Sequence, residues 1–208
     1  MTTSYPLIRA PNPAAAIGQL GGHVKMGMKP PKGRRTGKPM ALVSALPLAP
    51  GSDMIVLSYI DRFDPTETFD RKPNSGDNHV MVVPKLGIGL SMINGVCPGD
   101  FKGIKVAYGP AIEEPEELDL DPTSMNLEDS DRWFETVENL GCDCSKVGGY
   151  ALWPFEPVDV AKIMGRPQKF HHRISTDLIN FKLGDGGVVV VHVDVDGDGG
   201  SLCWQETR

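Results

Sequence analysis

The chain lacks long apolar runs and a recognisable leader sequence. None of its apolar runs approaches the roughly 18 to 20 residues that a membrane-spanning helix needs. The longest candidate, 40–48, is interrupted by Pro47. The N-terminus has no basic region followed by an apolar region and a cleavage site, so it does not match the pattern of a secretory signal. We therefore expect a soluble, cytoplasmic protein.

Cysteine is scarce. The four residues Cys97, Cys142, Cys144 and Cys203 are too few and too irregularly spaced for a disulfide framework in 208 residues. Cys142 and Cys144 form a C-x-C pair that could bind a soft metal, but structural zinc sites usually show two spaced pairs. We expect reduced structural thiols, no metal and no cofactor.

Catalytic signatures are also missing: there is no GxSxG elbow, no HExxH motif and no dinucleotide-binding fingerprint. The segment GRRTGKP at 33–39 resembles a phosphate-binding loop, but its glycines are one residue too close and Lys38 is followed by proline. His171 and His172 are adjacent, so we expect their side chains to diverge. We do not expect an enzyme.

Acidic residues are absent from the first 52 positions, which contain seven basic residues, so the remaining 156 positions carry a net charge of −13. The basic residues between Lys25 and Lys38 lack interleaved aromatic residues and belong to an acidic protein. We therefore do not expect a nucleic acid partner.

The acidic residues are concentrated between Glu113 and Asp131, and no basic residue follows until Arg132. Such a run can attract a basic partner, although a solvated acidic loop is the commoner explanation. The candidate partner-binding residues are Glu113, Glu114, Glu116, Glu117, Asp119 and Asp121.

Glycine (24) and proline (18) make up about a fifth of the chain, which favours short elements and many turns. The pattern predicts an α+β fold, mainly antiparallel β-sheet with two or three short helices. The predicted strands are 40–46, 54–60, 79–84, 104–108, 177–183 and 188–191. The predicted helices are 13–20 after Asn12, 129–140 before Gly141, and 157–164 before Gly165.

Two segments echo each other. LGGH at 20–23 and VGGYALW at 147–153 each precede an irregular stretch, a strand, a turn and a second strand. The spacing from the second glycine to the last strand is 32 residues in one case and 39 in the other, which indicates an approximate duplication. We predict a single compact domain over 1–208, with pseudo-repeat halves at about 12–110 and 128–208 and an acidic connection over 111–128.

Several segments together resemble a known family. KVGGYALWPFEP, LINFKL, GDGGVVVVHVDVDG and the closing LCWQE resemble the C-terminal part of the YwqG-like family, bacterial proteins of unknown function with Gly-Gly and Gly-Asp-Gly-Gly signatures. GKPMALVSALPL followed by MIVLSYID resembles an earlier strand pair of that family, so the match covers about 100 of 208 residues. It departs at Ser44 and at the valines of the last strand, where the family more often has glutamine and aromatics. The resemblance implies a mixed α+β fold and no particular chemistry, and some members resemble toxin-immunity proteins by their setting.

The segment DVDGDGG at 194–200 resembles the start of a calcium-binding loop, with Asp194, Asp196 and Asp198 alternating. Position twelve of such a loop would be Gln205 instead of a bidentate acid, and a valine strand precedes it. We predict a polar turn, and the sequence leaves open whether the three aspartates bind a cation.

These observations favour a bacterial immunity protein that binds and neutralises a cognate toxin, for instance a nuclease, through an acidic surface. Nucleases present basic phosphate-binding sites, whose substrate charge a carboxylate-rich patch can imitate. The alternative is a small-ligand-binding protein or an enzyme with a cleft between the halves, formed by Tyr150, Trp153, Asp185 and His192. A third hypothesis is a structural adaptor in a larger assembly.

Overall fold

The computed structural model describes residues 1–25, 29–61, 73, 75–86, 89–91, 103–153, 157–176, 178–179, 185–197 and 199–207. Within them the strands are β1 (Thr2–Arg9), β2 (Gly18–Leu20), β3 (His23–Lys25), β4 (Ala41–Pro47), β5 (Met54–Ile60), β6 (Asn78–Pro84), β7 (Gly89–Ser91), β8 (Ile104–Tyr108), β9 (Ile112–Glu114), β10 (Lys146–Gly148), β11 (Gln168–Ile174), β12 (Asp185–Asp194) and β13 (Gly200–Thr207). The helices are α1 (Leu127–Leu140) and α2 (Val160–Met164), with 3₁₀ turns η1 (Pro13–Ala15), η2 (Glu116–Asp119) and η3 (Pro122–Ser124).

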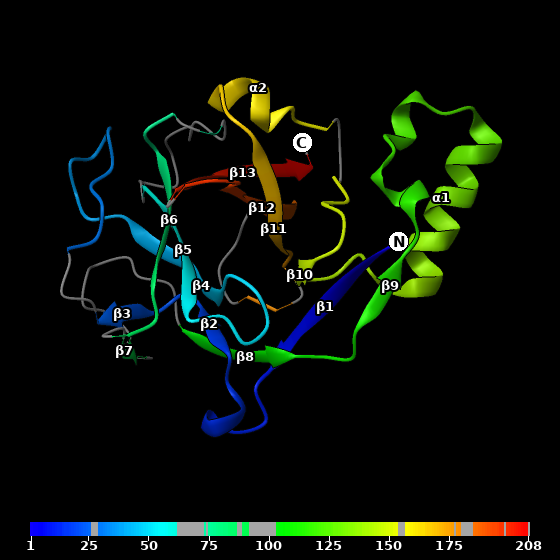
Figure 1. Cartoon of the computed structure of the whole chain (residues 1–208). Helices are drawn as coiled ribbons and strands as arrows, with labels where there is room; N and C mark the ends of the chain where they lie inside the picture. Colours follow the sequence, from blue (N-terminus) through cyan, green and yellow to red (C-terminus); the bar gives the residue numbers. More distant parts are fainter. Residues whose placement is uncertain are drawn as a thin grey trace.

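One large antiparallel sheet contains all these strands except β3 and β7, which pair with each other (Figure 1). Its order is β13-β12-β11-β10-β1-β8-β2-β4-β5-β6, and β9 pairs with β1 on the edge opposite β10, where it follows β8. The end strands β6 and β13 contact each other, with a bridge between Met81 and Gly199. The sheet is therefore nearly closed into a barrel.

Strand β1 lies in the middle of this sheet, although it is the first strand of the chain. Tyr5 pairs with Val147 of β10, and Ile8 pairs with Ala107 of β8. On one side of β1 the order runs through β8, β2, β4, β5 and β6, and on the other through β10 to β13. The two predicted halves thus contribute the two sides of one continuous sheet, and their origin as repeats stays a prediction.

The largest core cluster fills the interior of the curved sheet with residues from both sides of β1. Val43 and Val56 come from one side, and Val189, Val191 and Leu202 come from the other, all of them fully buried. Val188 to Val191 are all buried, which confirms the predicted strand with two covered faces.

Most of the predicted elements are confirmed. The strands at 40–46, 54–60, 79–84, 104–108 and 188–191 correspond to β4, β5, β6, β8 and β12, and β4 and β5 form the expected antiparallel pair. Helix α1 begins after Asn126, whose side chain accepts from the Asp129 N–H at 3.0 Å, and ends at Gly141 with φ 60°. Helix α2 is shorter than predicted and ends at Gly165.

One prediction on secondary structure is wrong. The helix at 13–20 is only the 3₁₀ turn η1 capped by Asn12, because Gln19 in β2 pairs with Ala45 on one side and Lys105 on the other. The backbone hydrogen bonds on both edges of β2 and the burial of its residues outweigh the helix propensity of the local sequence. The predicted strand at 177–183 lies mostly outside the described residues, and Leu178 and Ile179 are buried without belonging to a strand.

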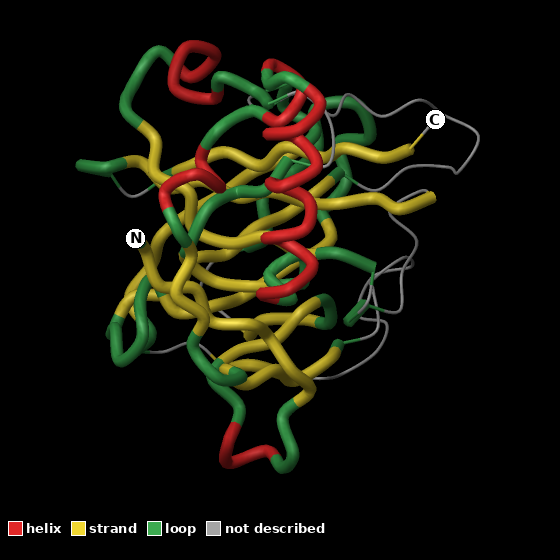
Figure 2. The backbone as a smooth tube through the Cα atoms, turned by 90° about the vertical axis from the view of Figure 1, so that its right-hand side faces the viewer, coloured by secondary structure: helices red, strands yellow, loops and turns green. Residues whose placement is uncertain are grey.

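Helix α1 packs on the outside of the sheet and runs across the strands (Figure 2). Neither α1 nor α2, the helices in the described part of the chain, is long and apolar enough to cross a membrane.

Candidate functional site

The acidic run forms a distinct surface feature, which we call the acidic lobe (residues 112–143: β9, η2, η3 and α1). It lies at one side of the sheet, where β9 and α1 are close together (Figure 1). The lobe contains twelve acidic residues and one basic residue, a net charge of −11 in a chain whose total is −6. Leu118, Trp133, Val137, Cys142 and Leu152 form a small core beneath it. The lobe is thus an ordered, packed unit.

Four of the six candidate carboxylates, those of Glu113, Glu116, Glu117 and Asp119, are exposed. Glu113 accepts a hydrogen bond from the Thr3 hydroxyl at 2.8 Å, which holds its side chain against β1. Asp121 is half-buried and belongs to the capping of η3. It accepts from the Thr123 N–H at 2.9 Å and from the Thr123 hydroxyl at 2.7 Å. Four carboxylates are therefore presented to solvent, and Asp121 contributes partly.

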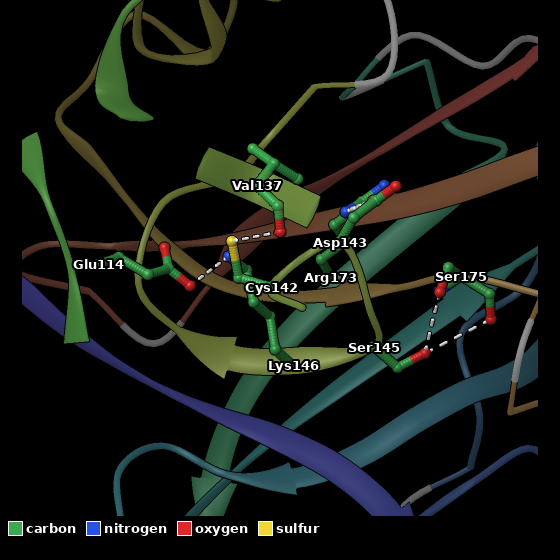
Figure 3. A network of polar contacts seen from close by, with 8 residues as sticks. All are labelled: Glu114, Val137, Cys142, Asp143, Ser145, Lys146, Arg173 and Ser175. Carbon is green, nitrogen blue, oxygen red and sulfur yellow. Dashed lines mark hydrogen bonds and ion pairs between the residues drawn. The ribbon is translucent and has the colours of Figure 1, made fainter. Parts of the chain in front are cut away.

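Glu114 departs from the expected acidic surface. Its carboxylate is fully buried and forms an ion pair of 2.5 Å with the ammonium group of Lys146, which is also fully buried (Figure 3). Alternation along β9 turns Glu114 inward while Glu113 points to solvent. Burial lowers the pKa of Lys146, and the Glu114 charge opposes that effect. Glu114 is therefore an internal counter-ion and not a partner-binding residue.

The second Gly-Gly segment makes room for this carboxylate. Gly149 has φ 75°, and a Cβ atom there would lie 2.5 Å from Glu114 Oε2. The same oxygen accepts a hydrogen bond from the Tyr150 N–H at 2.8 Å. The glycine is required both by its left-handed conformation and by the close approach of Glu114.

Other members of the buried network surround the ion pair. The Cys142 thiol donates to the Val137 carbonyl at 3.7 Å, and Arg173 pairs with Asp143 (Figure 3). Burial raises the pKa of Cys142, so this thiol is protonated at neutral pH. Cys142, Cys144 and Cys203 form no disulfide within the described part of the chain, and Cys97 lies outside it.

The lobe also contains an apolar pocket of about 490 Å³. Its apolar wall is formed by Pro115, Leu118, Leu120, Met125 and Trp133, and its polar rim by Glu117, Asp129, Arg132 and Thr136. The indole N–H of Trp133 is buried and has no acceptor in the described part of the chain. Leu120 of the wall is 58% exposed, and Phe134, whose ring lies edge-on to that of Trp133, is 56% exposed. The acidic lobe thus presents apolar surface that is surrounded by charged side chains.

Helix α1 adds carboxylates that were not among the sequence candidates. Glu128, Asp129, Asp131, Glu135 and Glu138 are all exposed on the helix. Among the residues with described positions, Arg132 is the basic side chain that pairs with them, at 3.6 Å from Glu128 and 4.0 Å from Asp129. The sequence alone was sufficient to place these residues on one helix next to the acidic run, because the helix that contains them was predicted.

A second polar feature crosses the barrel interior. The Ser58 and Ser44 hydroxyls are 2.5 Å apart, and Ser44 Oγ is 2.8 Å from His172 Nε2. The two Nδ1 atoms of His172 and His171 are 2.6 Å apart, and His171 Nε2 is 2.9 Å from the Pro47 carbonyl. We call this row the interior polar chain. It connects β5 and β4 with β11.

The expected divergence of His171 and His172 is wrong. The register of β11 shifts between Phe170 and His172, so a β-bulge places both rings in the interior with their centroids 4.8 Å apart. Strand β11 itself was missed by sequence reasoning, because QKFHHR is too polar to resemble a buried strand. In the structure, however, His171, His172 and Arg173 of this strand are all buried.

The contacts assign the protons of the interior polar chain. The Pro47 carbonyl can only accept, so His171 Nε2 donates and its Nδ1 accepts from His172 Nδ1–H. Neutral His172 then accepts from the Ser44 hydroxyl. Burial lowers the pKa of His171 to about 4 and that of His172 well below 6.5, which fits two neutral rings.

This connectivity resembles a serine activated by a histidine, but it is closed to substrate. Ser44, Ser58 and His172 are each 0% exposed, and of the four side chains only His171 lines a pocket. A nucleophile must reach its substrate. The interior polar chain therefore satisfies buried groups and fixes the position of β11.

The four residues of the alternative cleft are only partly brought together. The Trp153 and His192 rings stack with centroids 5.8 Å apart and an angle of 15°. Tyr150 packs instead against the core of the acidic lobe. Asp185 pairs with Thr207 through the backbone, and its side chain lies outside the described residues. Burial lowers the pKa of His192 to about 4.

The aspartate-rich turn after β12 is held by internal contacts. Asp194 pairs with Arg166 at 2.9 Å and accepts a hydrogen bond from Gln168. Asp196 is exposed, and Asp198 lies outside the described residues. Among the residues with described positions, no three histidine, cysteine, aspartate or glutamate side chains gather in a way that could hold a metal ion.

The loop at 33–39 surrounds a carboxylate of the protein itself. The Thr36 N–H and hydroxyl donate to Asp61 at 3.2 and 2.6 Å, and a Cβ atom on Gly33 would overlap the Asp61 carboxyl group. Arg35 pairs with the buried Asp77 at 2.9 Å. The space that a phosphate would need is occupied by Asp61.

No protein-family model matches this chain, and no curated protein matches it. Membership of the YwqG-like family therefore stays a prediction from the motifs.

Proposed function

We propose that the chain is a non-catalytic binding protein whose acidic lobe docks on a basic surface of a partner protein. The observation that carries the proposal is the separation of charge. The lobe has a net charge of −11, so the rest of the chain carries +5. Eleven of the twelve acids in the lobe are at least partly exposed.

Such a separation of charge accelerates and orients the encounter with a basic partner. The lobe is packed on its own small core, so its carboxylates are held in fixed positions before binding. A pre-formed surface loses less conformational entropy on association than a flexible acidic loop.

The apolar pocket supplies what charge alone does not. Energetic anchors at protein interfaces are apolar or aromatic side chains seated in pockets and surrounded by polar contacts. The pocket lined by Leu118, Met125 and Trp133, with Glu117 and Asp129 at its rim, fits one apolar side chain flanked by basic residues.

The partner class that agrees best with this surface is a toxin with a basic active site, such as a nuclease, which the chain would neutralise as a cytoplasmic immunity protein. Occlusion of a phosphate-binding site by carboxylates needs no cofactor, no metal and no catalysis by this chain. The resemblance of some YwqG-like members to immunity proteins supports the same class.

The test is the association rate of the chain with the product of the neighbouring reading frame, measured by stopped-flow fluorescence at low and high ionic strength. We expect the double variant Glu117→Lys, Asp119→Lys to slow association at least tenfold at low salt, with a smaller effect at high salt. Cells that express the partner should lose protection with the same variant.

The matched control is the double variant Asp53→Lys, Asp196→Lys, which reverses two exposed acids outside the lobe. It changes net charge equally and should slow association much less. Equal slowing by both double variants, or none by either, would remove the lobe from the mechanism.

We also propose that the two sides of the sheet descend from one duplicated unit. Both Gly-Gly segments have left-handed glycines, Gly21 and Gly22 in one and Gly148 and Gly149 in the other. In the sheet, the short strand at each Gly-Gly segment, β2 or β10, neighbours the first of three successive antiparallel strands, β4 to β6 or β11 to β13, and that first strand has a register shift in both cases. In this proposal β11, and not the segment at 177–183, corresponds to β4.

A further inference from the structure

The mouth of the barrel contains a pocket of about 530 Å³ that is separate from the acidic lobe's pocket. It is lined by residues of β1, β6, β10, β11 and β12 and by the turn at 48–50 after β4. Both sides of the sheet thus contribute to it. Barrel mouths are frequent sites of small-molecule binding.

The lining is mostly apolar. Leu48, Val82, Val147, Phe170 and Val193 form its wall. His171 also lines the pocket, but its ring nitrogens are occupied by Pro47 and His172. The interior polar chain therefore fixes His171 as a rigid part of the wall. An apolar body of a ligand fits such a surface.

Two charged residues line the pocket, and only one is free. Asp194 is already paired with Arg166. Lys169 is exposed and has no ion pair or hydrogen bond partner among the described residues. The pocket therefore presents one uncompensated positive charge.

We propose that the barrel-mouth pocket binds a small amphipathic anion, with its apolar chain or ring against Val147 and Val193 and its carboxylate beside Lys169. The proposal is independent of the acidic lobe, because no residue is shared between the two pockets. It requires neither a metal nor a chemical step.

The test uses decanoate and decan-1-ol as probes, with binding followed by titration calorimetry. Both have the same apolar chain, and only decanoate has a charge for Lys169. We expect decanoate to bind more tightly, and Lys169→Gln to weaken decanoate about fivefold, the effect of one partly exposed charge pair, without changing decan-1-ol. Lys162→Gln, an exposed lysine on α2 outside the pocket, is the matched control and should change neither.

A second variant tests the location. Ala49→Trp places a large side chain at an exposed position of the rim, where it should block the pocket without disturbing the core. We expect both probes to lose binding, while the thermal unfolding of the free protein is unchanged. Equal affinity for the two probes, an equal effect of Lys169→Gln and Lys162→Gln, or undiminished binding to Ala49→Trp would overturn the proposal. None of these outcomes bears on partner binding by the acidic lobe.

Discussion

At the scale of single residues, His171 and His192 are both buried but differ in their hydrogen bonds. His171 has a partner for each ring nitrogen, His172 on one side and Pro47 on the other. His192 stacks on Trp153, and its Nδ1 has no partner among the described residues. Because the two histidines are both buried but differ in hydrogen bonding, we expect the same substitution to affect stability differently at the two positions.

Burial lowers the pKa of each of these histidines from 6.5 to about 4 in the folded state. Between these two pH values the unfolded chain therefore binds protons that the folded chain does not bind. The contribution of each neutral histidine to the free energy of unfolding is complete above pH 6.5 and is lost as the pH falls towards 4. We expect roughly 3 kcal/mol of acid-linked loss for each histidine. Urea unfolding at a series of pH values measures it.

The variant His192→Phe should keep the stack on Trp153 and remove one titrating group. We expect little change in stability at pH 7 and a smaller acid-linked loss. His171→Phe should destabilise the protein by about 2 kcal/mol or more at pH 7, because the His172 Nδ1–H and the Pro47 carbonyl lose their partner. If the two variants behave alike, the assigned hydrogen bonds are wrong.

The buried ion pair gives a second prediction. Lys146→Met should reduce the free energy of unfolding by about 3 to 5 kcal/mol, because the Glu114 carboxylate stays buried without a counter-ion. Adding Glu114→Gln removes that charge and keeps an oxygen for the Tyr150 N–H, so the double variant should recover part of the loss. Chemical unfolding of the three proteins decides the matter, and a double variant no more stable than Lys146→Met would contradict it.

At the scale of elements, sequence reasoning succeeded where apolar pattern and capping residues agreed. Strand β12 and helix α1 are examples, since the valine run, the amphipathic pattern and the Gly141 cap are local signals. It failed at β2 and β11. Pairing on both edges makes 18–20 a strand, and a bulge buries two histidines in β11; both effects depend on neighbours distant in sequence.

The contact between β13 and β6, which nearly closes the barrel, gives an element-scale prediction. A Cβ atom on Gly200 would lie 2.2 Å from the His192 carbonyl oxygen and 2.9 Å from Val80 Cγ1. We expect Gly200→Val to separate β13 from β6 and to lower the free energy of unfolding by more than about 2 kcal/mol. Amide exchange in β6 and β13 should become faster. Exchange measured by mass spectrometry tests this.

The control for this prediction is Gly51→Ala. Gly51 has φ 77° and open space around its Cβ position, so only a backbone cost of about 1 to 2 kcal/mol is expected. Exchange in β6 and β13 should stay as in the parent protein. Unchanged exchange in Gly200→Val would show that closure does not depend on this glycine.

At the scale of the whole molecule, the printed sequence revealed the acidic run but not which carboxylates face outward. Strand alternation in β9 buries Glu114, and that requires knowing that 112–114 pairs with β1. The two pockets could not be predicted at all. The barrel-mouth pocket is lined by segments that the order of the sheet brings together, such as Thr3 of β1 and Val193 of β12, and the lobe pocket depends on how η2 and η3 pack against α1.

The central position of β1 also affects how the protein is made. During synthesis this strand is complete long before either of its neighbours, β8 at 104–108 or β10 at 146–148, has been translated. The two edges of β1 and the apolar side chain of Leu7 have no native partners until both β8 and β10 have been translated. The nascent chain therefore exposes an unpaired strand until its last third emerges from the ribosome. Chaperone demand is therefore concentrated in this interval.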